Sequence, residues 1–212
     1  AYMDSVPMVA ITGNVSTDLI GKDSFQEIYI AGVTIPITKH NFMIRSVEEL
    51  APTLRAAFEI AQSGRKGPVL VDIPKDITAA VTEFEPQTKK EHTRALPEAG
   101  EEELRAVAEM INQSERPAIY FGGGVAAADA GAALLALMNK ASIPATRTLM
   151  ASGVLSYDEP KNLGLLGMHG SRTANLAVDE ADLVLALGTR FSDRVALNPA
   201  SFAAQAKIVH ID

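Results

Sequence analysis

The chain has no cysteine among its 212 residues, so neither a disulfide framework nor thiolate chemistry is open to it. This composition is compatible with a reducing compartment, and we expect a cytoplasmic protein. Positive charge is also in short supply, because 19 lysines and arginines stand against 26 aspartates and glutamates, for a net charge of −7. General nucleic-acid binding requires a basic face, so no nucleic-acid partner is expected.

Long hydrophobic runs are missing as well. No apolar stretch approaches the roughly 20 residues of a membrane-spanning helix, and no signal peptide is visible, so we expect no membrane partner. What is present is an ordinary globular composition, with 47% apolar and 21% charged residues. A chain of this length can bury a sizeable core.

Both ends of the sequence fall close to expected strands. Ala1 stands shortly before one of them, and the strand expected at 207–212 has no helix after it. A βα repeat rarely stops in this way, because one face of its sheet would stay uncovered. We therefore expect the sequence to be an internal piece of a larger enzyme.

Short apolar segments alternate with helical patterns along most of the chain. Strands are predicted at residues 7–12, 68–73, 118–121, 143–146, 182–187 and 208–211. Helices are predicted around residues 130–139 and 174–181. Two more are predicted from apolar residues at helical spacing. The first set is Leu50, Leu54, Ala57, Phe58 and Ala61, and the second is Leu104, Val107, Ala108 and Ile111. Ser46 and Glu49 form a capping-box pattern before the first of these sets, and Gly64 ends that helix.

Residues 84–98 are polar and contain Pro86 and Pro97, which predicts an interdomain linker. One domain is therefore expected at 1–83 and another at 99–212. The alternation of strands and helices predicts an α/β fold of parallel sheets covered by helices, Rossmann-like in the second domain. In such sheets, ligands bind outside the carboxyl ends of the strands.

Glycines follow one of these predicted strand ends. Gly122, Gly123 and Gly124 precede a helix, and a backbone without Cβ atoms can approach a phosphate closely. The run lacks a full Gly-x-Gly-x-x-Gly fingerprint, so a tight strand-to-helix turn without a ligand stays open.

Arginines follow another predicted strand, which ends at Gly188. Arg190 and Arg194 flank Asp193 in one short loop, and the planar guanidinium fork suits a phosphate or a carboxylate. A surface ion pair with Asp193 is the alternative. We favour anion binding, because loops at this edge carry the site in such folds.

Two glycines, Gly167 and Gly170, bracket Met168 and His169, which suggests close backbone approach to a flat group. The remaining histidines show no spacing typical of metal ligands, so no metal site is expected. One of them, His210, stands in an apolar strand and is predicted to be a satisfied core residue.

Two further charged residues follow predicted strands. Asp212 could bind ribose hydroxyls or cap a following helix. Lys75 stands where an anionic substrate could meet it, although most such lysines are simply solvated.

Taken together, the motifs resemble the catalytic large subunits of acetolactate synthases, also called acetohydroxyacid synthases, over essentially the whole chain. In the first domain the resemblance is carried by residues 4–13, by Asp23-Ser24-Phe25-Gln26-Glu27, by residues 37–42 and by residues 67–76. In the second it is carried by Thr148-Leu149-Met150, by residues 166–170, by Arg190-Phe191-Ser192-Asp193-Arg194 and by residues 207–212.

This resemblance implies a thiamine-diphosphate enzyme of three α/β domains, with 1–83 as part of the pyrimidine-binding domain and 99–212 as most of an FAD-binding central domain. The whole enzyme would condense two pyruvates to 2-acetolactate with release of CO₂, or pyruvate with 2-oxobutanoate, in branched-chain amino-acid biosynthesis. It would contain thiamine diphosphate and Mg²⁺, assemble as a homodimer or larger, and could bind a regulatory small subunit.

The resemblance also assigns site residues. Those that match the family's substrate pocket are Phe25, Gln26, Lys75, Asp193 and Arg194. Those that match its FAD site are Arg65, Gly122, Gly123, Thr148, Leu149, Met150, Gly167, Met168, His169, Gly170, Gly188, Arg190 and Asp212.

Some family features have no counterpart here. Asp18 stands where relatives carry a basic residue. The family's catalytic glutamate and its Gly-Asp-Gly…Asn motif for Mg²⁺ and diphosphate are not in this sequence, so we expect the chain alone to be inactive and to bind no thiamine diphosphate. The alternatives are a related thiamine enzyme, such as a pyruvate oxidase or glyoxylate carboligase, and a non-catalytic nucleotide-binding module.

Overall fold

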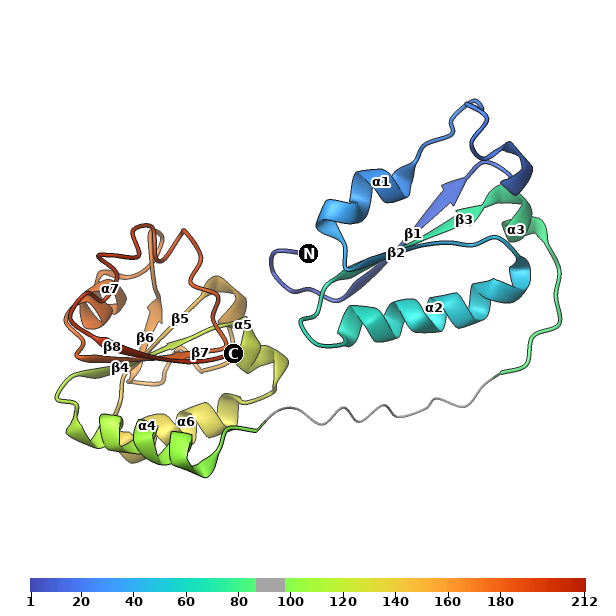
Figure 1. The fold of residues 1–212 in the computed structure, drawn as a ribbon. Coiled ribbons are helices and arrows are strands. Elements are labelled where there is room, and N and C mark those ends of the chain that lie inside the picture. Colours follow the sequence, from blue (N-terminus) through green and yellow to red (C-terminus); the bar gives the residue numbers. More distant parts are fainter. Residues whose placement is uncertain (87–97) are drawn as a thin grey trace. The chain divides into compact units, whose positions relative to one another are not determined.

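The computed structural model describes residues 1–86 and 98–212. The chain divides into two compact units, Ala1–His92 and Thr93–Asp212 (Figure 1). Most of the expected linker at 84–98 lies outside the described residues. Within the described ranges, no helix is both long and apolar enough to cross a membrane.

The first unit contains a parallel sheet of three strands in the order β1-β3-β2. Its strands are β1 (Met8–Asn14), β2 (His40–Met43) and β3 (Pro68–Pro74). The helices α1 (Ile30–Thr34) and α2 (Val47–Gln62) lie on opposite faces of this sheet, and α3 (Lys75–Ala79) follows β3 (Figure 1). Two short 3₁₀ turns are η1 (Thr17–Leu19) and η2 (Ile35–Ile37). Because β3 is the central strand and is buried on both faces, its sequence is a nearly continuous apolar run.

Helix α2 departs from its sequence pattern in two details. Ser46 is its N-cap, but its side chain makes no capping bond, and the carboxylate of Glu49 accepts from the backbone N–H of Arg45 instead. The capping-box prediction was therefore wrong. Ala57 and Ala61 are buried as predicted, whereas Phe58 is 55% exposed, because it lies at the margin of the apolar stripe.

The second unit contains five parallel strands in the order β6-β5-β4-β7-β8. They are β4 (Pro117–Phe121), β5 (Ala145–Arg147), β6 (Asn162–Leu165), β7 (Leu183–Leu187) and β8 (Lys207–Ile211). The chain runs outward from β4 to β6 and then returns to the other side of β4 for β7. This doubly wound order places a topological switch point between β4 and β7 and confirms the α/β, Rossmann-like prediction.

Helices cover both faces of this sheet. Figure 1 shows α4 (Glu101–Gln113) and α6 (Gly131–Ala141) on one face and α7 (Arg172–Asp179) on the other. The short α5 (Gly123–Ala127) and the 3₁₀ turn η3 (Leu149–Ala151) follow β4 and β5. In α4 the residues that pack on the core are Val107, Met110 and Ile111. Leu104 and Ala108, which belong to the predicted apolar set, are exposed. The face of α4 that packs on the core is therefore rotated by part of a turn from the predicted one.

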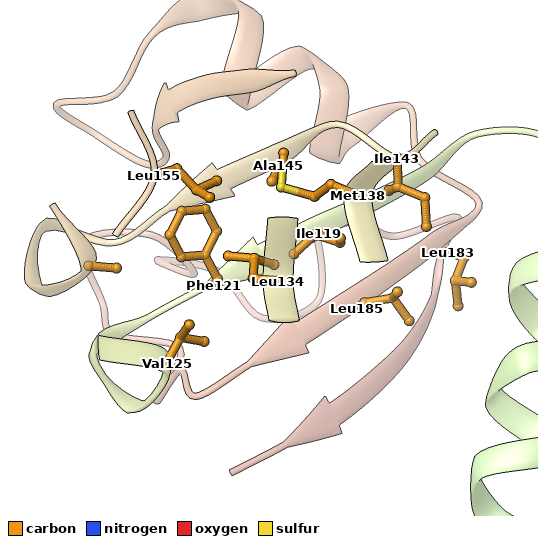
Figure 2. Packing of buried hydrophobic residues seen from close by; sticks show 11 residues of the cluster. Ile119, Phe121, Val125, Leu134, Met138, Ile143, Ala145, Leu155, Leu183 and Leu185 are labelled. Carbon is orange, nitrogen blue, oxygen red and sulfur yellow. The ribbon is translucent and has the colours of Figure 1, made fainter. Parts of the chain in front are cut away.

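In the core of the second unit, successive side chains of a strand point to opposite faces of the sheet. Ile119 and Phe121 of β4 point toward α6, where they meet Leu134 and Met138 (Figure 2). Tyr120 points to the opposite face, in the cluster that contains Val178 of α7. Each fully buried aliphatic or aromatic side chain of this kind contributes about 1.5–3 kcal/mol. The two half-cores hold β4 rigidly at the centre, which fixes the loops at its end.

Strand β8 forms one edge of the sheet and is largely exposed, with Ile208 and Ile211 45% and 51% accessible. His210 is exposed too, so its prediction as a core residue was wrong. Its ring is nevertheless satisfied, because Nε2 lies 2.8 Å from the backbone oxygen of Thr189.

Candidate functional site

The carboxyl ends of the five strands in the second unit meet at one edge of its sheet, because all neighbouring pairs are parallel. The loop after each strand therefore opens at the same edge. The predicted site residues that the structure brings to this edge are Gly122, Gly123, Thr148, Leu149, Met150, Gly167, Met168, His169, Gly170, Gly188, Arg190, Asp193, Arg194 and Asp212.

At the switch point, two glycine loops touch backbone to backbone. The N–H of Gly122 donates to Leu187 O at 2.8 Å, and the N–H of Gly124 donates to Gly188 O at 3.0 Å. A Cβ on Gly122 would lie 2.3 Å from Gly188 O, and one on Gly188 would lie 2.6 Å from the Cα of Gly124. The close packing of β4 on β7 thus accounts for these glycines without a ligand, and contact of Gly122 and Gly188 with a nucleotide stays a prediction.

Unsatisfied hydroxyls flank this switch point. Among the described residues, the buried side-chain oxygens without a hydrogen-bond partner are those of Thr146, Thr148 and Thr189. Thr148 follows β5 and Thr189 follows β7, so these two lie in loops on either side of β4. A buried polar group without a partner costs about 1–3 kcal/mol. The two hydroxyls are therefore suited to receive hydrogen bonds from a polar ligand at this edge, or to donate them.

The loop after β6 presents Met168 and His169, which are both exposed. Gly167 in this loop has a φ of +99°, and a Cβ there would lie 2.5 Å from Arg194 O. The N–H of Met168 donates to the same Arg194 oxygen at 2.9 Å. Only glycine fits at 167, because the β6 and β7 loops are joined at that point.

The β6 loop has a further partner that the sequence reasoning missed. The side-chain amide of Asn175, on α7, bonds both main-chain groups of Gly167. The available signal was an asparagine inside a short helix, where its propensity is poor and a side-chain-to-backbone bond is a common explanation.

The loop after β7 is anchored by an aromatic cluster. Phe191 has a left-handed φ of +49°, and its ring packs edge-on against Tyr120 and Phe202 and against the ring of His210. Burial raises the pKa of Tyr120 to about 12, and the positive charge of Arg190 opposes that rise. Arg190 itself is exposed, so the loop presents a guanidinium at the edge.

The next pair in this loop is a surface ion pair. Arg194 Nε lies 3.8 Å from Asp193 Oδ2, and the two side chains are 68% and 75% exposed. An exposed pair of this kind contributes little to stability. The ion pair that was the alternative for Asp193 is thus present, and it leaves the guanidinium open to solvent.

The other predicted site residues belong to the first unit. Phe25 is 88% exposed, in the segment that follows β1, and Gln26 beside it has a left-handed φ of +66°. Lys75 is exposed at the start of α3, directly after β3. Arg65 lies before β3, where its Nε donates to Ser5 Oγ at 2.9 Å.

Buried polar contacts shape the loops around Lys75. The carboxylate of Asp72 accepts from Thr12 Oγ1 at 2.7 Å and from Asn14 Nδ2 at 2.6 Å. The hydroxyl and the N–H of Thr17 both donate to Asp76, and the hydroxyl bond is the main cause of its lowered pKa. The bonds to Asp72 join β1 to β3, and the bonds to Asp76 join the segment after β1 to the start of α3. No group of three His, Asp or Glu side chains that could hold a metal ion occurs in the described parts of either unit.

Comparison with known proteins adds two findings. Residues 104–212 match the family model of the thiamine pyrophosphate enzyme central domain. The whole chain is 49% identical to the acetolactate synthase isozyme 1 large subunit of Escherichia coli K12 and 46% identical to the isozyme 2 large subunit, covering 37% and 38% of them. It is also 46% identical to a probable acetolactate synthase large subunit of Methanocaldococcus jannaschii, of which it covers 37%. The chain thus spans less than two fifths of the length of these relatives.

Proposed function

The chain belongs to the thiamine pyrophosphate enzyme family, and from this membership we propose that it works as part of an acetolactate synthase large subunit. The enzyme would join two pyruvates to 2-acetolactate with loss of CO₂, or pyruvate to 2-oxobutanoate, in branched-chain amino-acid biosynthesis. The observation that carries this proposal is an identity of 49% to such a subunit along all 212 residues.

Within that enzyme, the carboxyl edge of the second unit would bind FAD. Three features of the edge fit a dinucleotide. The exposed guanidinium of Arg190 suits the diphosphate, the exposed Met168 and His169 suit a flat ring, and the unpartnered hydroxyls of Thr148 and Thr189 suit polar groups. Asp212, at the end of β8, would accept from ribose hydroxyls.

The remaining members of the proposed FAD site are Arg65, Gly122, Gly123, Leu149, Met150, Gly167, Gly170 and Gly188. When bound, the flavin would supply a planar, redox-active ring system. The protein's own residues at this edge would hold the ring system and orient it.

The residues proposed for the substrate pocket are Phe25, Gln26 and Lys75 of the first unit and Asp193 and Arg194 of the second. Lys75 and Arg194 each carry an exposed positive charge that suits the carboxylate of a 2-oxo acid, and Asp193 would orient Arg194. Thiamine diphosphate and Mg²⁺ belong to the complete enzyme, and we propose that the chain alone neither binds thiamine diphosphate nor forms acetolactate. A homodimer or larger assembly, a regulatory small subunit and a cytoplasmic location stay predictions.

A segment exchange tests the proposed activity. The corresponding segment of the E. coli isozyme 1 large subunit would be replaced by this chain, and acetolactate formation from pyruvate would be measured with and without 2-oxobutanoate. We expect the chimera to be active, since both cover the same segment at 49% identity. A folded chimera that binds its cofactors and forms no acetolactate would refute the proposed function.

A titration tests the flavin site separately. FAD would be added to the purified chain and its fluorescence followed, with the variants Arg190→Gln and Arg105→Gln compared. Arg105 is an exposed arginine of α4, paired with Glu101, and serves as the matched control. Loss of one charged hydrogen bond to phosphate should weaken FAD binding by about tenfold in Arg190→Gln and leave Arg105→Gln unchanged. Equal affinities in both variants would exclude Arg190 from the site.

A further inference from the structure

The side-chain amide of Asn175 is the contact that holds the β6 loop in shape. We propose that Asn175 is a positioning residue for the nucleotide site: it fixes Gly167 so that Met168 and His169 face the ligand. This inference rests on the proposed FAD site and adds to it a residue that does not itself touch the ligand.

The geometry is that of a two-way clamp. The Oδ1 atom of Asn175 accepts from the N–H of Gly167 at 3.1 Å, and its Nδ2 donates to the carbonyl of the same residue at 3.1 Å. The Nδ2 atom donates a second bond to Ser171 O at 2.9 Å. One planar amide therefore binds both main-chain groups at the start of the loop and one carbonyl at its end, which few side chains can do.

The clamped loop is joined to its neighbour at the next residue. Immediately after Gly167, the N–H of Met168 donates to Arg194 O at 2.9 Å. The positive φ of Gly167 allows this approach, since a Cβ would collide with the same oxygen. Asn175 thus sets the position of Gly167, and Gly167 sets the register between the β6 loop and the arginine loop of β7.

The rest of the loop is held by Ser171, the N-cap of α7. Its N–H donates to Leu165 O at 2.9 Å, and its hydroxyl donates to Leu163 O at 2.8 Å and accepts from the N–H of Ala174. Between these two fixed ends, the side chains of Met168 and His169 are exposed. The clamp therefore orients the two side chains expected to meet the ring without contacting it.

The presence of asparagine at position 175 indicates that this residue positions the β6 loop and does not serve to stabilise helix α7. Asparagine is a poorer helix former than alanine, so α7 by itself would be stabilised by alanine at 175. Aspartate would keep the acceptor but place a charged oxygen beside the carbonyls of Gly167 and Ser171. Alanine and aspartate variants should thus disturb the loop while the helix persists, and aspartate should disturb it more.

The test uses the full chain with Asn175→Ala, Asn175→Asp and the control Thr173→Ala, an exposed position on the same helix. Hydrogen–deuterium exchange of peptides covering 163–171 and 188–196 reports the loops, circular dichroism reports the helix, and titration with FAD reports the site. We expect exchange in both loops to be at least about tenfold faster in the Asn175 variants, FAD affinity to fall by about tenfold, and Thr173→Ala to match the parent chain.

The outcomes separate the inference from the proposed function. If the parent chain fails to bind FAD at all, the proposed FAD site is refuted and the positioning role falls with it. If the parent chain binds FAD and the Asn175 variants keep its affinity, the FAD site stands and the positioning role is overturned. Unchanged loop exchange in Asn175→Ala would overturn the clamp directly.

Discussion

Replacing Gly188 with alanine should destabilise the second unit by two separate effects. The residue has a φ of +57°, which costs an alanine about 1–2 kcal/mol. The new Cβ would also lie 2.6 Å from the Cα of Gly124 and 2.7 Å from the N of Val125, so the two loops at the switch point must move apart. Overpacking of this kind costs about 1–3 kcal/mol. We expect a loss of about 2–5 kcal/mol in the free energy of unfolding.

The matched control is Gly153→Ala. Gly153 also has a positive φ, of +88°, but a Cβ there would meet no atom within 4 Å, so only the backbone cost of about 1–2 kcal/mol applies. Urea denaturation followed by circular dichroism measures both variants, and the transition that Gly153→Ala shifts identifies the second unit. The midpoint should fall by about 1–2 M for Gly188→Ala. If Gly188→Ala costs no more than Gly153→Ala, the loops at the switch point accommodate the added Cβ and the predicted overpacking is refuted.

Two titrations test the surroundings of single groups. Bonds from the hydroxyl of Ser114 and the N–H groups of Glu115 and Arg116 lower the pKa of Asp182 to about 2. Its ionised form therefore stabilises the fold above about pH 4, and this contribution is lost as the pH falls toward 2. Asp182→Asn should lower the melting temperature at pH 7 and match the parent chain near pH 2; an equal deficit at both pH values would contradict this. Burial raises the pKa of Tyr120 to about 12, so its neutral form stabilises the fold below about pH 10 and the contribution is lost toward pH 12. Absorbance at 295 nm should show one late-titrating tyrosine that Tyr120→Phe removes, and an unchanged curve in that variant would refute the assignment.

The central strands could be predicted from the sequence because they are buried on both faces. Residues 68–73, 118–121 and 182–187 are nearly continuous apolar runs, and each became the core of a strand. The edge strand Asn162–Leu165 was missed, since it contains a glycine and an asparagine and is only partly buried. The segment at His40–Met43 was missed for the same reason: a short edge strand has little apolar patterning of its own.

The position of the candidate site followed from the parallel sheet, but its internal contacts did not. Once the strands are parallel, the loops that contain Met150, Met168 and Arg190 must share one edge. The bond between Asn175 and Gly167 depends on how α7 docks on the sheet, which no local pattern encodes. The exposed position of His210 depends likewise on its strand being at the edge, since the same residues in a central strand would be buried.

The glycine loops at the switch point are already bonded to neighbouring backbone groups, and this limits how a ligand can bind there. Gly122, Gly124 and Gly188 allow two loops to meet, and the N–H groups of Gly122 and Gly124 already donate to neighbouring carbonyls. A phosphate held there would have to compete with these bonds. Side chains at this edge that a ligand could meet include the exposed guanidinium of Arg190 and the unpartnered hydroxyl of Thr189. The edge therefore favours a ligand that lies across the loops over one whose phosphate enters between β4 and β7. An extended dinucleotide meets that requirement, because it can reach the side chains of several loops at once.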